Sequence, residues 1–480
     1  MRHGGGEGRN RISDSSAARR ADNFFTILLP LPDDFLPPPR HIGPMRKTFF
    51  AFGLAAGLAT NLAAGDTLRL KLEPDRGFLL SGSPQEVVVK IDLTAAGHKK
   101  KLKRTPLNLA VVLDRSGSMT GAKIEKARQA AMGLVDQLAP GDYFSLIAYS
   151  DSAEVLVPAQ ELEDKDAVKS RISRIRPGGS TALYAGVELG AKELQRHLSN
   201  RRINRVILLS DGLANVGPSS TQDLRQLGRA LSERGISVTT IGVGDDYNED
   251  LMAGLAEGSD ANYYYVKDTE RLPQIFAKEL GELVTVAARE VRIEIICPPG
   301  VKPIGLIGRP EVFSGQKASV QLSQLALEQD RFLFLRCLVN EPQPEIAAVT
   351  ARYTDELNGG TEQSLSERAS VRFTDDESVA VKSQRAEIVA QKELLLTAVA
   401  KDAALADADS GRYKQAAVTL NRQAIVLDQQ CLNAPALVQS QLRQEAENLR
   451  LRASQLDQNQ YDSATRKAMQ SESWNMRNSK

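Results

Sequence analysis

The chain has 480 residues, enough for roughly two to four domains of ordinary size. Its 61 Lys and Arg residues are balanced by 60 Asp and Glu residues, so a formal net charge of +1 gives no reason to expect a nucleic acid as the partner. Three cysteines are too few for a disulfide-built scaffold, and metal binding through cysteine is not expected. The function must therefore be sought in local motifs.

A hydrophobic segment near the amino terminus has the pattern of a secretory signal peptide. Residues 45–64 have a basic start, an apolar centre and small residues at the end. We therefore expect export to the periplasm, the cell envelope or the extracellular space. Residues 1–44 precede such a signal awkwardly, so we expect a disordered or mis-assigned extension, with Met45 as the true start. An uncleaved membrane anchor is the alternative, which the short apolar part disfavours.

Alternating apolar and polar residues occur on both sides of the central part of the chain. This pattern is typical of half-buried antiparallel strands. We expect one β-sandwich whose first strands lie in residues 66–104 and whose remainder lies in residues 287–380. Two unrelated strand clusters are the alternative. This alternative is disfavoured because the leading strands alone are too few to bury a core. The basic run at 98–104 is expected to be a solvated linker or loop rather than a site for a polyanion.

Strand-like and helix-like segments alternate in the central part, residues 106–286. The strand-like runs lie at 108–114, 143–149, 153–157, 205–211, 236–243 and 263–266. Apolar residues with helical spacing follow several of them, beginning at Ile124, Leu224 and Leu272. Such alternation predicts an α/β fold, a Rossmann-like doubly wound sheet that is mainly parallel and covered on both faces.

Small oxygen-bearing side chains follow the ends of the apolar runs. Asp114, Ser116 and Ser118 occupy alternate positions after the first run, Thr181 follows a Gly-Gly turn, and Asp211 ends another run. The carboxyl ends of parallel strands meet at one edge of a sheet, so we expect Asp114 and Asp211 to lie close together. Carboxylate and hydroxyl oxygens without Cys or His suit a hard cation such as Mg²⁺ or Mn²⁺. The pattern predicts a metal site that is open on one side.

In order and spacing, these five residues resemble the metal-ion-dependent adhesion site (MIDAS) of von Willebrand factor A-type (VWA) domains. The resemblance extends over roughly residues 106–286. It implies a VWA fold whose first four site residues hold a divalent cation directly or through water, while Asp211 acts through a water or from behind them. It also implies a protein partner that completes the coordination with an Asp or Glu carboxylate.

We therefore expect an exported adhesion or binding module rather than an enzyme. A serine nucleophile would need a base, and His98 and His197 are both poorly placed for that role. Mg²⁺ held by hydroxyls activates water weakly without a dedicated base. An envelope assembly scaffold with permanent, metal-stabilised contacts is the alternative function. A purely structural metal is disfavoured because such a metal would be expected to have a closed coordination shell.

The carboxyl-terminal part of the sequence changes to a helical pattern. Residues 381–455 have helical spacing with a turn at Ser410-Gly411, and predict a helical hairpin region that resembles one tetratricopeptide-type hairpin without the period of an array. The polar residues 456–480 are expected to be a disordered tail. Cys297 and Cys337 lie in neighbouring strand-like runs, and could form a disulfide or remain as buried thiols.

Overall fold

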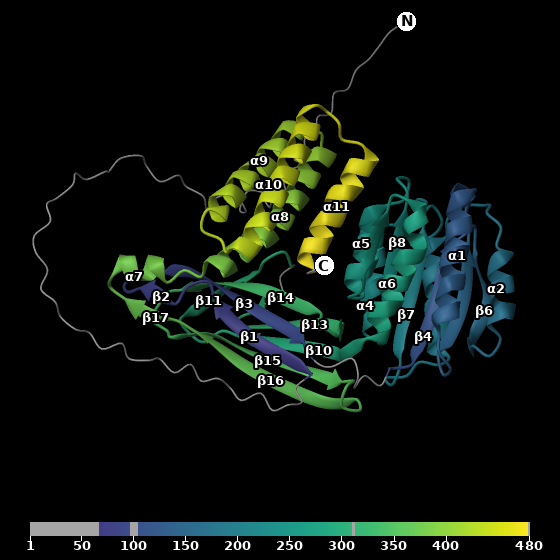
Figure 1. Ribbon diagram of the computed structural model, residues 1–480, viewed down its shortest axis with the longest axis horizontal. Helices are drawn as coiled ribbons and strands as arrows, with labels where there is room; N and C mark the ends of the chain where they lie inside the picture. The colour runs from purple at the N-terminus through teal and green to yellow at the C-terminus, as the bar shows by residue number, and fades with distance from the viewer. Residues whose placement is uncertain (1–66, 97–103, 310–312, 479–480) are drawn as a thin grey trace, which may run out of the picture. The chain divides into compact units, whose positions relative to one another are not determined.

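The computed structural model describes residues 67–96, 104–309 and 313–478 (Figure 1). The expected extension and signal peptide lie outside the described residues, as does most of the basic run. In the part of the chain that the structure describes, no helix is both long enough and apolar enough to span a membrane.

A six-stranded sheet in the order β6-β5-β4-β7-β8-β9 forms the centre of the chain. Its strands are β4 (Leu107–Asp114), β5 (Tyr143–Tyr149), β6 (Ala153–Glu161), β7 (Ile203–Ser210), β8 (Ile236–Val243) and β9 (Tyr263–Val266). Only β6 runs antiparallel to its neighbour. Every residue of β4, β7 and β8 is buried, as a parallel sheet covered on both faces requires. The predicted mainly parallel sheet is confirmed.

Helices pack on both faces of this sheet. They are α1 (Ala122–Gln137), α2 (Lys165–Ser173), α3 (Leu183–Gln195), α4 (Thr221–Ser232), α5 (Glu249–Gly258) and α6 (Leu272–Val284). Alternate residues of β4 point to opposite faces. Leu109 and Val111 belong to one apolar core with α1, α2 and α6, whereas Ala110 and Val112 belong to a second core with α3, α4 and α5. The strand at the middle of the sheet is thus fixed from both sides.

Two antiparallel sheets flank this domain in sequence, with the orders β1-β3-β14-β11 and β12-β13-β10-β15-β16. Their strands are β1 (Leu68–Pro74), β3 (Gln85–Ala95), β10 (Val286–Ile296), β11 (Val301–Leu306), β12 (Phe313–Ser314), β13 (Lys317–Ala326), β14 (Asp330–Val339), β15 (Glu345–Asp355) and β16 (Thr361–Ser370). The leading strand β3 pairs with β14 along its length, from Thr94 opposite Asp330 to Gln85 opposite Val339. Segments from both sides of the central domain therefore build one sheet.

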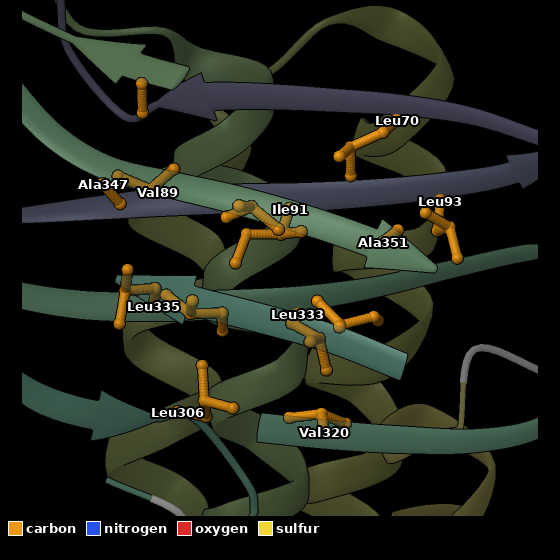
Figure 2. Packing of buried hydrophobic residues seen from close by; sticks show 14 of the residues in the cluster. Leu70, Val89, Ile91, Leu93, Leu306, Val320, Leu333, Leu335, Ala347 and Ala351 are labelled. Atoms are coloured by element: carbon orange, nitrogen blue, oxygen red, sulfur yellow. The ribbon is translucent and has the colours of Figure 1, made fainter. Parts of the chain in front are cut away.

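The two antiparallel sheets share one apolar core (Figure 2). Leu70, Val89, Ile91, Leu333 and Leu335 come from one sheet, and Val320, Ala347 and Ala351 come from the other. Cys297 directly follows β10 of one sheet, and Cys337 lies in β14 of the other. Both thiols are free and buried, with their Sγ atoms 3.8 Å apart. A short parallel pair, β2 (Phe78–Leu80) with β17 (Arg372–Thr374), completes the strands.

The carboxyl-terminal segment is helical, in α7 (Glu377–Lys382), α8 (Ala386–Asp409), α9 (Tyr413–Cys431), α10 (Ala436–Asp457) and α11 (Ser463–Arg477). The expectation of a disordered tail from residue 456 is wrong, because α11 occupies most of it. Asp462 caps this helix by accepting a hydrogen bond from the Thr465 N–H at 2.8 Å. Met469 and Trp474 are buried and anchor an otherwise polar helix. Glu472 adds ion pairs with Lys401 of α8 and Arg452 of α10, both at 2.6 Å, so polar contacts also hold this helix.

Candidate metal centre

The predicted site residues all lie at the carboxyl-terminal edge of the six-stranded sheet. Asp114 is the last residue of β4, and Asp211 directly follows β7, the parallel neighbour of β4. Ser116 and Ser118 lie in the loop after β4, where a short 3-10 helix, η2 (Gly117–Met119), begins. Thr181 lies just before α3. The fold thus brings the three separate motifs together.

Hydrogen bonds through the two serines join the two aspartates. The Ser118 hydroxyl donates to Asp211 Oδ1 at 2.7 Å, and its Oγ lies 2.9 Å from Ser116 Oγ. Asp114 accepts from the Ser116 N–H at 2.8 Å and from the Ser210 hydroxyl at 2.8 Å. Both carboxylates are therefore held in fixed orientations before any ligand arrives.

The Thr181 hydroxyl meets the two serine hydroxyls beside Gly212. A Cβ atom on Gly212 would lie 3.1 Å from Thr181 Oγ1, 3.2 Å from Ser118 Oγ and 3.7 Å from Ser116 Oγ. The three hydroxyls thus surround one small space, which is free because residue 212 has no side chain. Ser116 and Thr181 are buried, whereas Ser118 is exposed. The cluster is consequently open to solvent on one side.

The Gly-Gly turn that carries Thr181 is tied to the loop after β4. The Gly178 N–H donates to the Arg115 carbonyl at 2.7 Å, and the Gly117 N–H donates to the Gly179 carbonyl at 3.0 Å. Gly179 has φ of +84°, a conformation that favours glycine. The Ser180 N–H donates to Asp151, and this hydrogen bond holds the pKa of that exposed carboxyl below its usual value. The two loops therefore position their hydroxyls jointly.

The electrostatics of the cluster favour an added cation. Asp114 and Asp211 are both 0% exposed. Burial raises the pKa of Asp114, and the nearby Asp211 raises it further, while hydrogen bonds from Ser116 and Ser210 act in the opposite direction. Lys123 Nζ lies 2.6 Å from Asp211 Oδ2, but within the described residues no ion pair involves Asp114. A buried carboxylate without a cation is costly, and a bound metal would relieve this cost.

The donor set fits a hard divalent cation. The described residues contain no group of three or more His, Cys, Asp or Glu side chains placed to hold a metal, so a cation at this cluster would need hydroxyl ligands as well. Hydroxyl and carboxylate oxygens suit Mg²⁺ or Mn²⁺, and these ions commonly keep positions for water or an incoming ligand. The geometry is thus compatible with the site predicted from the sequence.

Three neighbours of the site were not assigned a role from sequence: Ser210, Gly212 and Lys123. The first two flank Asp211 in the chain, but their roles depend on distances to other loops. Lys123 lies in the first turn of α1. A cation in the first turn of a helix is unfavourable by itself, but the sequence does not indicate which carboxylate offsets its charge.

Comparison with known proteins identifies the central domain. Residues 108–278 match the model of the von Willebrand factor type A domain. The chain contains a VWA domain. It is 28% identical over 293 residues to the uncharacterized protein sll0103 of Synechocystis, which covers 58% of this chain and 68% of that protein. It is 25% identical over 213 residues to the uncharacterized protein YfbK of Escherichia coli, across 44% of this chain and 37% of YfbK.

Solved structures share the fold beyond the VWA domain. A von Willebrand factor type A protein from Catenulispora acidiphila superposes with a TM-score of 0.61 at 16% identity, covering 76% of this chain and 87% of that one. The ArnB paralog VWA2 from Sulfolobus acidocaldarius superposes with a TM-score of 0.59 at 18% identity, covering 86% of this chain and 98% of that one. Both alignments are longer than the VWA domain itself, so the flanking parts also have structural counterparts.

Proposed function

We propose that the VWA domain binds a divalent cation, Mg²⁺ or Mn²⁺, and uses it to capture an Asp or Glu carboxylate of a protein partner. The observation that carries this proposal is the meeting of the Ser116, Ser118 and Thr181 hydroxyls around the space beside Gly212. Two fully buried carboxylates are hydrogen-bonded to the serines of this cluster, Asp211 to the Ser118 hydroxyl and Asp114 to the Ser116 N–H. The exposed side of Ser118 leaves a path for an incoming ligand.

The residues of the cluster would have different roles in holding the cation, according to their charge and position. Asp114 and the three hydroxyls would hold the cation directly or through water, and Asp211 would act through a water molecule or through Ser118, to which it is hydrogen-bonded. Among these direct ligands only Asp114 carries a negative charge, so it would offset half of the charge of a divalent cation. The cation would therefore remain electrophilic and would attract a carboxylate strongly.

We further propose that the cluster is not a hydrolytic centre. His197 packs against Tyr143, the first residue of β5, with ring centroids 4.0 Å apart. It therefore belongs to the amino-terminal edge of the sheet, opposite the candidate metal centre. Among the described residues near the hydroxyl cluster, no histidine is available as the general base that a serine nucleophile needs.

Replacing Thr181 with alanine should weaken partner capture to the same extent as chelation. The hydroxyl of Thr181 adjoins the cluster, whereas its backbone is held independently by Asn215, whose side-chain oxygen accepts from the Thr181 N–H at 2.8 Å. The measurement is the affinity of the immobilised protein for a partner retained from an envelope extract, in Mg²⁺ and in EDTA. The two losses should not add, because both remove one interaction.

A matched control for this experiment is Thr419→Ala in α9, whose hydroxyl donates only to the Gln415 carbonyl of its own helix. This variant should capture the partner as the wild type does. Partner affinity that is unchanged by both Thr181→Ala and EDTA would contradict metal-mediated capture. The protein would then be better described as an envelope scaffold with constitutive contacts.

We also propose that the protein is exported, which is supported by the signal-like composition of residues 45–64. A chain expressed from Met45 in a bacterial host should reach the periplasm and lose about twenty residues, the usual length of such a signal. Mass spectrometry of the periplasmic and cytoplasmic fractions measures this. Intact protein found only in the cytoplasm would show that the segment is not a signal peptide.

A further inference from the structure

Lys123 and Asp211 form an ion pair behind the hydroxyl cluster, and we infer that the Lys123 ammonium makes cation binding depend on the partner's carboxylate. This inference rests on the proposed function and adds a regulatory residue to it. Lys123 Nζ lies 2.6 Å from Asp211 Oδ2. The other oxygen of that carboxylate, Oδ1, accepts the Ser118 hydroxyl at 2.7 Å. One carboxylate thus links the lysine to the cluster.

The lysine is held in this position by its surroundings. Its side chain is 24% exposed, whereas the Asp211 side chain is fully buried. A Cβ atom on Gly244, in the loop after β8, would lie 3.6 Å from both Cε and Nζ of Lys123, so the end of the lysine packs against that loop. A second carboxylate, Asp246, lies 3.9 Å from Nζ but is 78% exposed, so solvent screens it. Asp211 is therefore the main partner of the ammonium.

Charge counting gives the consequence. Two buried carboxylates and one ammonium carry a net of one negative charge, which a divalent cation would convert to one positive charge. A carboxylate from the partner would then bring the cluster to neutrality. Without the lysine charge, the cation alone would already neutralise the cluster. Lys123 thus lowers the affinity for a cation on its own and raises the gain from a bound carboxylate.

The partner chemistry that follows is an acidic side chain rather than a neutral one. A neutral amide or hydroxyl from a partner would leave the positive charge of the cluster uncompensated. An uncompensated charge is unfavourable there, because the cluster is partly buried and its local dielectric constant is low. A protein with this lysine should accordingly hold its cation weakly until the carboxylate arrives. Cation and carboxylate would bind with positive coupling, and each would tighten the other by the same factor.

The test measures Mn²⁺ binding to the full chain by calorimetry, with chloride or acetate as the anion at equal ionic strength. The variants are Lys123→Met, Lys123→Arg and the control Lys126→Met. Lys126 lies one turn further along the same helix and pairs with Glu270 at 2.7 Å, so its replacement removes an equal charge elsewhere. Thermal unfolding in EDTA checks the fold of each variant, and Lys123→Gln serves as a second neutral variant.

The wild type should bind Mn²⁺ more tightly in acetate than in chloride. In chloride, Lys123→Met should bind Mn²⁺ at least about tenfold more tightly than the wild type, because a unit charge that repels the cation has been removed. The affinity of this variant for Mn²⁺ should increase little in acetate. Lys123→Arg and Lys126→Met should behave as the wild type does.

The inference would be overturned if Lys123→Met, Lys123→Gln and the wild type bound Mn²⁺ with equal affinity and if acetate raised that affinity equally in all three. Lys123 would then be a purely structural partner of Asp211. A wild type that binds no Mn²⁺ in either chloride or acetate would instead overturn the proposed metal site itself. The two failures are therefore distinguishable.

Discussion

Replacing Asp114 with alanine is expected to abolish the binding of Mg²⁺ and Mn²⁺. Asp114 is fully buried, two hydrogen bonds fix its orientation, and no described ion pair offsets its charge. It is therefore the strongest anionic donor that the cluster can offer to a metal. Calorimetric titration should give a dissociation constant of about micromolar to millimolar for the wild type, as expected of a shallow oxygen site, and no binding for the variant.

Asp114→Asn is the matched control for this prediction, because it keeps an acceptor for Ser116 and Ser210 and removes only the charge. Burial raises the pKa of Asp114, so in the metal-free protein its ionised form opposes folding. The contribution of this group to stability should decrease as the pH rises through its folded-state pKa, and Asp114→Asn should lack that dependence. Metal binding that survives in Asp114→Ala would show that the site is elsewhere.

Replacing Gly212 with alanine is expected to weaken metal binding by about tenfold or more without unfolding the domain. The new methyl group would crowd the hydroxyls of Thr181 and Ser118, at 3.1 Å and 3.2 Å, and push them apart. Overpacking of this kind costs about 1–3 kcal/mol of folding stability. If about 1.4 kcal/mol of such strain is felt by the bound cation, the affinity decreases about tenfold. The same Mn²⁺ titration measures the loss, and thermal unfolding in EDTA measures the stability.

Gly281→Ala in α6 is the control for this second variant, because nothing lies within 4 Å of its added Cβ atom. It should bind Mn²⁺ as the wild type does. An unchanged affinity in Gly212→Ala would mean that the hydroxyls do not need to converge beside residue 212. The assignment of Thr181 to the site would then lose its geometric support.

The positions of the site residues could be predicted because the sequence marks strand ends. Asp114 and Asp211 each end an apolar run, and the rule that parallel strands align their carboxyl ends places the two near each other. Distances between loops are not encoded in local pattern, so the roles of Ser210, Gly212 and Lys123 became visible only in the structure. Each of these residues acts by contacting a residue of the site, and such contacts cannot be identified from the residue type alone.

The fold could be predicted where periodicity was strong and was missed where it was weak. The mainly apolar runs that form the buried strands β4, β7 and β8 were identified as strands. Helix α2 was not predicted, because only Val168 and Ile172 of its short sequence are buried. Helix α5 contains two glycines and packs very close to α4, where a Cβ on Gly228 would lie 2.5 Å from the Leu255 carbonyl oxygen. Glycine at a close helix contact weakens the local helical signal.

The central claim is that a divalent cation binds among the hydroxyls of Ser116, Ser118 and Thr181, and anomalous diffraction from crystals containing Mn²⁺ tests it most directly. The account predicts one strong anomalous peak within coordination distance of these hydroxyls and near Asp114, with a free coordination position on the exposed side of Ser118. Calorimetric Mn²⁺ binding combined with the absence of such a peak, or with a peak elsewhere in the chain, would contradict the account.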